Sequence, residues 1–436
     1  MTNRREFLKI SATAPLMCVP PQIVSNKAGT TAVPPEKDAV RRLRELCITG
    51  LKERYQKNTI RFSCGELSRD VIERLDEELA VIQSVDATQD FLRLYEIVQF
   101  VRNRHGYLRA RGTAVGSLVN YALGVSPVCP VEHGLIWEPF LSPANASPRS
   151  MLAYVSSGPD EPNTMAADIV VHLSEQLGYR RDGPAHVLPG PNSDARHDSA
   201  THLTFVTLWE LAILARTVDL VRRTHGVRLD LDSVPLTDES TFELLANGDT
   251  DHIFGLNDEW SKDLLRQIRP TCFRHVLDSV ALSRPALDYA DHRRAEAYVE
   301  QRPRWQTALH PLYTPILKRS RGVLLYQEQV MKILHRIAGI PPAVSFELVK
   351  AICRRDAVAI ARIGEAFLSG ARIHGIATMD AGILFEKLIS EAGSSRCESH
   401  VAAEAFLICQ MAFLKAHYRR EFLVAAEHEQ KKVRTI

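Results

Sequence analysis

The sequence lacks an excess of charge of one sign. Its 436 residues include 54 Lys and Arg against 52 Asp and Glu, which gives a formal net charge of +2. Composition alone therefore does not indicate a nucleic-acid-binding protein, and any basic surface has to be local. No apolar run approaches the ~18 residues of a transmembrane helix, so we expect no membrane partner.

The sequence also lacks the cysteine patterns of metal and disulfide sites. Its eight cysteines form no C-x-x-C pair and no Cys/His cluster with zinc spacing. We therefore expect a reduced chain without disulfides. An apolar content of 45% and a charged content of 24% are typical of a soluble globular protein, and the length allows two or three structural units.

The N-terminal segment allows two interpretations. Residues 3–9, Asn-Arg-Arg-Glu-Phe-Leu-Lys, resemble a twin-arginine export signal. Pro15, Pro20 and Pro21 interrupt the apolar stretch that follows, and no clear cleavage site comes after it. We therefore predict that residues 1–34 are a flexible leader of a cytoplasmic protein, with export as the alternative.

The apolar periodicity predicts a mostly helical α+β protein with few strands. Residues 37–56 have an apolar stripe that predicts a helix. Ser68 and Thr88 are expected to cap the next two helices, and Gly106 to end the second of these. Residues 205–225 also have helical periodicity.

A glycine-containing loop at residues 110–123 is a candidate phosphate site. Gly112 and Gly116, with Thr113 and Ser117, precede a predicted helix, and Arg111 supplies a cation. Free backbone N–H groups at a helix start, together with an arginine, suit a phosphate. The alternative is a tight loop that requires glycine for packing.

A second polar cluster follows the apolar run Val323–Leu325. Tyr326, Gln327, Glu328 and Gln329 stand between that run and a segment with helical apolar spacing. These side chains are either placed to contact a ligand or lie on the solvated side of a strand-to-helix corner.

Both segments resemble the bacterial DNA polymerase III alpha subunit, the C-family replicases. The unbroken Leu-Tyr-Gln-Glu-Gln-Val-Met of residues 325–331 is similar to the family's fingers. Residues 110–119 are similar to its triphosphate loop, Gly-Arg-Gly-Ser-x-x-x-Ser-Leu-Val. Ala110 takes the place of the leading glycine and Thr113 that of the first serine.

The resemblance implies a palm, thumb and fingers remnant with a reduced mixed sheet. It assigns residues 35–235 to a degenerate palm with thumb helices and residues 236–436 to the fingers. It also implies residues that contact nucleotide phosphates. These are Arg111, Gly112, Thr113, Gly116, Ser117, Arg284, Arg354, Arg355 and His400.

The resemblance fails at the metal-binding aspartates of the family. Those positions fall near Leu152, Tyr154 and Thr204, and nucleotidyl transfer needs two metal ions held by acidic oxygens. We therefore expect no metal and no cofactor, unless Mg²⁺ is held by relocated carboxylates. The candidates for such relocation are Asp160 with Glu161 and Asp194 with Asp198.

These observations favour a catalytically silent polymerase-like module. Such a module would bind primer–template DNA, a nucleotide or proteins of replication or repair. At Glu398 the resemblance places a carboxylate where the family has a lysine, which reverses a charge expected to attract the ligand. The alternatives are an active DNA-directed DNA polymerase with relocated carboxylates, and an exported protein that reuses the fold.

Overall fold

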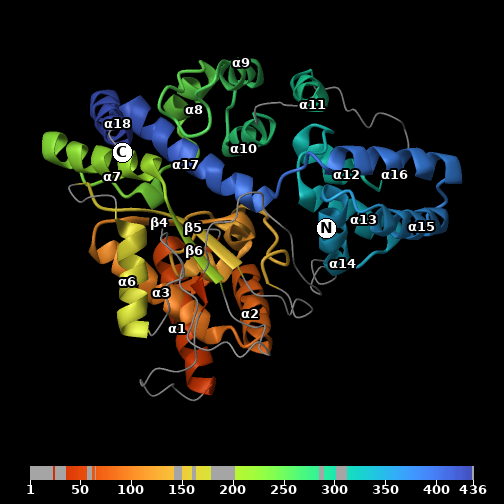
Figure 1. Cartoon of the computed structure of the whole chain (residues 1–436), viewed down its shortest axis with the longest axis horizontal. Coiled ribbons are helices and arrows are strands. Elements are labelled where there is room, and N and C mark those ends of the chain that lie inside the picture. Colours follow the sequence, from red (N-terminus) through yellow and green to blue (C-terminus); the bar gives the residue numbers. More distant parts are fainter. Residues whose placement is uncertain are drawn as a thin grey trace. The chain divides into compact units, whose positions relative to one another are not determined.

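The computed structural model describes residues 23–24, 36–55, 61–63, 65–141, 150–159, 164–177, 202–283, 289–300 and 312–434. The chain is divided into two compact units (Figure 1). The helical unit comprises Leu236–Ala405, and the sheet unit comprises the described residues before and after that segment. The two C-terminal helices thus belong largely with the sheet, whereas the sequence assigned residues 236–436 to one segment.

The sheet unit is built on a four-stranded mixed sheet with the order β1-β6-β5-β4. Strands β5 and β6 are parallel, and both outer pairs are antiparallel. The mostly helical fold with a small mixed sheet is therefore confirmed. The strands are β1 (Ile23–Val24), β4 (Tyr107–Arg111), β5 (Ser150–Ser156) and β6 (His202–Thr207).

Side chains alternate between the two faces of this sheet, as the pleat of a strand requires. One face is apolar and buried, and includes Ala110, Met151, Ala153, Leu203 and Phe205. The other face carries the polar side chains that are described below.

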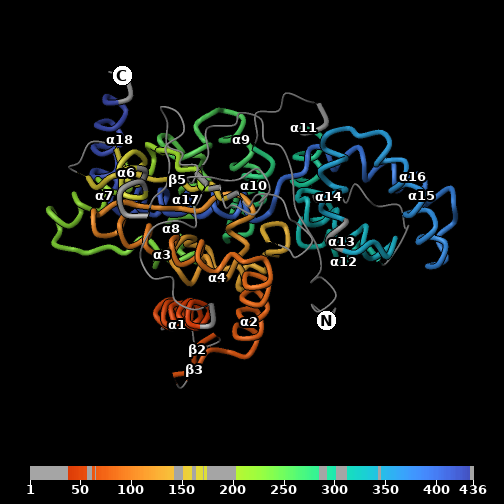
Figure 2. The backbone as a smooth tube through the Cα atoms, turned by 60° about the horizontal axis from the view of Figure 1, so that its bottom comes forward, coloured from red at the N-terminus to blue at the C-terminus, as the bar shows by residue number. Residues whose placement is uncertain are grey.

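Helices cover both sides of the strands (Figure 1). Helices α3 and α6 contact the strands and each other, and α7 pairs with α18 along much of its length. A short hairpin of β2 (Phe62–Ser63) and β3 (Glu66–Leu67) lies beside α1 (Figure 2). The helices of this unit are α1 (Glu36–Tyr55), α2 (Arg69–Ser84), α3 (Thr88–Asn103), η2 (Gly112–Gly116), α4 (Leu118–Ala122), α5 (Pro130–His133), α6 (Met165–Leu177), α7 (Trp209–His225), η3 (Leu231–Ser233) and α18 (Arg419–Arg434).

Three predictions about helix starts differ from the structure in position or in capping. The helix predicted from residue 205 begins at Trp209, because Phe205 lies in β6 opposite Ala153. Helix α2 follows Ser68 as expected, but the Ser68 hydroxyl donates to Asp70 instead of accepting from the helix. Helix α3 begins at Thr88 itself. Tertiary pairing in the sheet overrides the helical periodicity at Phe205.

Gly106 lies three residues beyond the end of α3. The helix ends at Asn103, and the Gly106 N–H donates to the carbonyl oxygen of Val101. The glycine therefore closes the last turn from outside the helix.

The helical unit is built from helices, several of which begin with an aspartate cap. The side chains of Asp238 and Asp258 accept from the backbone N–H groups of Thr241 and Ser261, which satisfies donors that a helix start leaves open. The helices are α8 (Glu239–Ala246), α9 (Glu259–Ile268), α10 (Phe273–Leu282), α11 (Tyr289–Val299), α12 (Thr314–Leu317), η4 (Lys318–Ser320), α13 (Gln327–Ala338), α14 (Pro342–Cys353), α15 (Ala357–Ile373) and α16 (Thr378–Ala392). Helix α17 (Glu398–His417) begins in this unit.

None of the helices in the described part of the chain combines the length and the apolar composition needed to cross a bilayer.

Candidate functional site

The polar face of the sheet brings together the three positions that the resemblance relates to metal-binding aspartates. Leu152 lies opposite Thr204 on the parallel strand and opposite Arg111 on the antiparallel strand. Tyr154 lies two residues further along the same strand, opposite Arg109. Because residues two apart on a strand share a face, Leu152, Tyr154 and Thr204 form one patch.

The chemistry of this patch is that of a cation and an aromatic ring. The Arg111 guanidinium carbon lies 5.0 Å from the centre of the Tyr154 ring, a distance at which the ring attracts a cation. Leu152 offers no ligand atom, and Thr204 offers one hydroxyl that is almost fully buried. A hard divalent cation requires several oxygen ligands, mostly carboxylates.

No group of three His, Cys, Asp or Glu side chains converges as a metal site in the residues that the structure describes. The four carboxylates that the sequence offered as replacements fall outside those residues. They are Asp160, Glu161, Asp194 and Asp198.

The glycine loop after β4 is a short 3₁₀ helix followed by the start of α4. Gly112 has a φ of +72°, a conformation that favours glycine, and Thr113 beside it is half-buried. A Cβ at Gly116 would overlap the carbonyl oxygen of Ile136. Both glycines thus have a conformational or packing reason for their presence.

A carboxylate of the chain itself occupies the start of α4. Glu78 accepts from the Ser117 hydroxyl at 2.7 Å, from the Leu118 N–H at 2.9 Å and from the Val119 N–H at 3.2 Å. Its exposed fraction is 1%. The N–H groups expected to meet a phosphate at this helix start therefore already have an anionic partner.

Arg74 completes this cluster. Its Nε lies 2.6 Å from Glu78, and its Nη2 donates to the Gly116 carbonyl oxygen at 3.0 Å. The sequence prediction missed Glu78, although a signal was present. Glu78 stands on the apolar side of α2 next to Leu75 and Leu79, and a charge in that position requires a buried partner.

The polar cluster at the start of α13 is bonded inside the helical unit. The Tyr326 hydroxyl donates to Asp278, and so does the Tyr298 hydroxyl at 2.8 Å. Burial raises the pKa of Asp278 to about 6. The Asp278 carboxylate, which the sequence did not single out, thus anchors two tyrosines.

Gln329 and Glu328 hold the backbone on either side of this corner. The Gln329 side chain accepts from the N–H groups of Leu325 and Tyr326 at 2.8 and 3.0 Å. Glu328 accepts from the Glu398 N–H at 2.8 Å, and burial followed by the Glu398 charge raises its pKa to about 7. These side chains are buried, and of the four motif residues only Gln327 is half-exposed.

The remaining candidate residues do not form one cluster in the described part of the chain. Arg354 and Arg355 are exposed after the end of α14. His400 lies 3.0 Å from Glu404. Arg284 falls outside the described residues.

Two arginines neutralise the carboxylates near the start of α17. Glu398 lies 2.8 Å from Arg274, and Glu404 pairs with Arg396 at 2.5 Å. Burial raises the pKa of Glu404, but the hydrogen bond and charge of His400 and the charge of Arg396 outweigh it and hold the pKa at about 2. The charge of Glu398 is therefore compensated internally.

Two family models match the chain. Residues 41–149 match the bacterial DNA polymerase III alpha NTPase domain, and residues 210–375 match the bacterial DNA polymerase III alpha subunit finger domain. The first covers the Glu78 cluster and the glycine loop, and the second covers the motif at the start of α13.

Individual relatives agree with these matches. The chain is 26% identical to a DNA polymerase III subunit alpha from Halalkalibacterium halodurans, over 90% of this chain and 43% of that protein. It is 25% identical to the subunit from Streptococcus pyogenes, over 89% and 46%, and 24% identical to that from Aquifex aeolicus, over 89% and 44%. The chain thus spans less than half the length of these relatives.

Proposed function

Because this chain is a relative of the bacterial DNA polymerase III alpha subunit, we propose that it is a DNA-binding module of replication or repair without nucleotidyl transferase activity. Its ligand is primer–template DNA or a nucleotide. Substrate binding can persist without nucleotidyl transfer, because the two depend on different side chains.

The observation that carries the proposal is the composition of the polar sheet face. Leu152 and Thr204 stand opposite each other, and Arg111 stacks on Tyr154. A transferase has to place two divalent cations between the attacking oxygen and the leaving pyrophosphate. A guanidinium over an aromatic ring repels such cations and attracts phosphate oxygens instead.

The match to the finger domain supports DNA as the ligand. That match includes Arg354 and Arg355, which are adjacent, exposed and close to Lys350. Lys350 is buried and pairs with Glu347 at 2.7 Å, and burial lowers its pKa to about 8. The two exposed arginines are therefore the better candidates for phosphate contacts.

Primer extension tests the catalytic half of the proposal. The purified 436-residue chain is incubated with a primer–template, all four deoxynucleotides and either Mg²⁺ or Mn²⁺, and we expect no extension product. Metal-dependent extension that co-purifies with the chain would instead support a polymerase with relocated carboxylates.

Salt-dependent DNA binding tests the other half. Affinity for a primer–template should fall steeply with salt, with a log–log slope of about −0.7 to −0.9 per phosphate contact. The double variant R354Q/R355Q should reduce both affinity and slope, whereas R362Q, a charge removal on the neighbouring helix α15, serves as the control. Weak binding that does not depend on salt would favour a protein partner over DNA.

The sheet face itself can be tested by restoring carboxylates. In the variant L152D/T204D, two carboxylates would face each other across parallel strands about 4.8 Å apart. We expect this variant to bind Mn²⁺, as measured by electron paramagnetic resonance, and the uncharged variant L152N/T204N not to bind it. Equal Mn²⁺ binding by both variants would show that the register does not define a latent metal face.

A further inference from the structure

A cavity of about 700 Å³ lies along the edge strand β4 in the sheet unit. It is separate from the patch of Leu152, Tyr154 and Thr204, none of which lines it. Its walls come from α1, α3, β4, the end of α4 and the segment around η3. The volume falls within the ~300–1,000 Å³ that small-molecule sites typically have.

Three guanidinium groups meet in this cavity around one carboxylate. Arg109 lies 2.6 Å from Asp232, and Arg54 lies 3.6 Å from the other oxygen of the same carboxylate. A Cβ on Gly124 would overlap Arg102 and would also touch Arg54, so these two guanidiniums are close neighbours. We call Arg54, Arg102, Arg109 and Asp232 the arginine cluster.

Asp232 does not neutralise the arginine cluster. One carboxylate faces three cations, and the buried Arg109 Nε has no hydrogen-bond partner among the described residues. Burial and the charge of Arg54 lower the pKa of Arg102, which records the repulsion between neighbouring cations. Burial raises the pKa of Asp232, but the three arginines outweigh burial and lower it.

The other two acidic residues that line the cavity are solvent-exposed, and the charge of one of them, Glu53, acts on Arg102. Glu53 is exposed on α1. Asp230 is exposed as well, and its carboxylate accepts from the Asp232 N–H and the Ser233 hydroxyl. Neither carboxylate hydrogen-bonds to an arginine of the cluster in the described part of the chain. Among those residues, only the Asp232 carboxylate is therefore within ion-pair distance of the arginine cluster, and three guanidinium groups share it.

We propose that the arginine cluster binds a small phosphorylated ligand of about the size of a mononucleotide. Guanidinium groups present paired N–H donors that match phosphate oxygens. Arg102 makes no ion pair within the part of the chain that the structure describes, and its guanidinium lies beside that of Arg54 on the wall of the cavity, within reach of such an anion. Tyr107 and Tyr121, already in contact with Arg109 and Arg54 at 5.2 and 4.7 Å, supply aromatic walls for the rest of the ligand.

Isothermal titration calorimetry on the full chain tests this site with two probes, inorganic pyrophosphate and deoxyadenosine monophosphate. Both should bind. A higher affinity for the nucleotide would indicate that the nucleoside also contacts the tyrosines, and equal affinities would indicate recognition of the phosphate alone. A Kd weaker than about 1 mM for both probes would overturn the proposal.

Arg102→Gln provides the matched perturbation because Arg102 lines the cavity, keeps a solvent-accessible surface and is not part of the apolar core. We expect the affinity for both probes to fall by about tenfold or more, since a charge-assisted contact is lost. The control is Arg104→Gln on the next turn after α3, because Arg104 pairs with Asp168 at 3.1 Å and does not line the cavity. Equal effects of the two variants would mean that only general charge matters and would refute the site.

The outcome is independent of the proposed DNA binding. Arg102→Gln should leave the salt dependence of primer–template binding unchanged, whereas R354Q/R355Q should leave pyrophosphate binding unchanged. If instead the pyrophosphate affinity follows the R354Q/R355Q variant, the phosphate site belongs to the helical unit and the arginine cluster only holds η3 in place.

Discussion

The buried carboxylate of Glu78 gives the sharpest test of how the glycine loop is held. Glu78→Gln keeps the shape of the side chain but removes the charge that faces Arg74 at 2.6 Å. It also turns one of two acceptor oxygens, which together bind a hydroxyl and two N–H groups, into a donor. Because the pair is buried, we expect a loss of about 3–5 kcal/mol in the free energy of unfolding.

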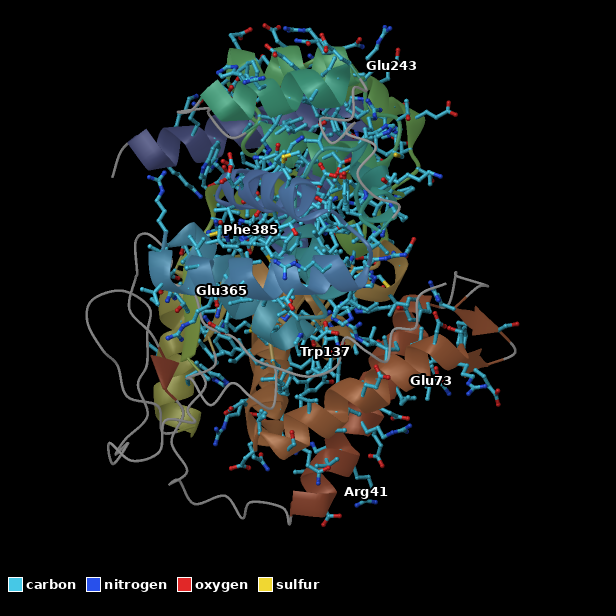
Figure 3. The ribbon with its side chains drawn as sticks, turned by 90° about the vertical axis from the view of Figure 1, so that its right-hand side faces the viewer. Arg41, Glu73, Trp137, Glu243, Glu365 and Phe385 are labelled. Atoms are coloured by element: carbon cyan, nitrogen blue, oxygen red, sulfur yellow. The ribbon has the colours of Figure 1, made fainter. Side chains whose placement is uncertain are left out.

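The same helix provides a matched control. Glu73, labelled in Figure 3, pairs with Arg69 at 2.7 Å with the same four-residue spacing, but its side chain is 51% exposed. An exposed pair of this kind contributes about 0–1 kcal/mol. Glu73→Gln should therefore leave the stability almost unchanged, and the difference between the two variants measures the effect of burial.

Urea unfolding and hydrogen exchange together measure this prediction. The midpoint of the sheet unit should shift strongly in Glu78→Gln, and a peptide covering Leu118 and Val119 should lose protection because their N–H groups lose the carboxylate. If Glu78→Gln is no more destabilising than Glu73→Gln, or if that peptide keeps its protection, the carboxylate does not organise the start of α4.

Three further substitutions test the charge of Asp278 and the packing around two helical glycines. Burial raises the pKa of Asp278 from 3.8 to about 6, so its contribution to stability is greatest below about pH 4 and is lost as the pH rises through 6. Denaturation at a series of pH values should therefore show a shallower decline over that window in Asp278→Asn, and an unchanged decline would refute this assignment. Gly50→Ala should destabilise α1 by about 1–3 kcal/mol because the new Cβ would overlap the Ala122 carbonyl oxygen. Gly382→Ala, in an open part of α16, should stabilise by about 0.5–1 kcal/mol, and thermal unfolding that gives both variants the same sign would contradict the packing argument.

Local patterns in the sequence were sufficient for the mostly helical fold. The stripe over residues 37–56 and the start of α2 after Ser68 follow from periodicity and helix-start signals, and both are present in the structure. The resemblance placed Leu152 and Thr204 at related positions, and the parallel register puts them opposite each other.

Long-range pairing explains what the sequence did not predict. The apolar spacing around Phe205 is helical, yet the residue lies in β6 and pairs with Ala153 of β5. Glu78 and its partners at the start of α4 are about 40 residues apart in sequence, and no local pattern links them. The arginine cluster likewise joins α1, α3, β4 and η3, so only the folded chain brings its charges together.

The internal bonding of the motif at the start of α13 affects how relatives of this chain are recognised. Tyr326, Glu328 and Gln329 each hydrogen-bond to a group that would otherwise be buried without a partner. A relative that has lost catalytic activity but still has to fold would therefore retain these three residues. Similarity in this segment therefore indicates a shared fold. Proteins that share the segment can differ in whether they catalyse a reaction.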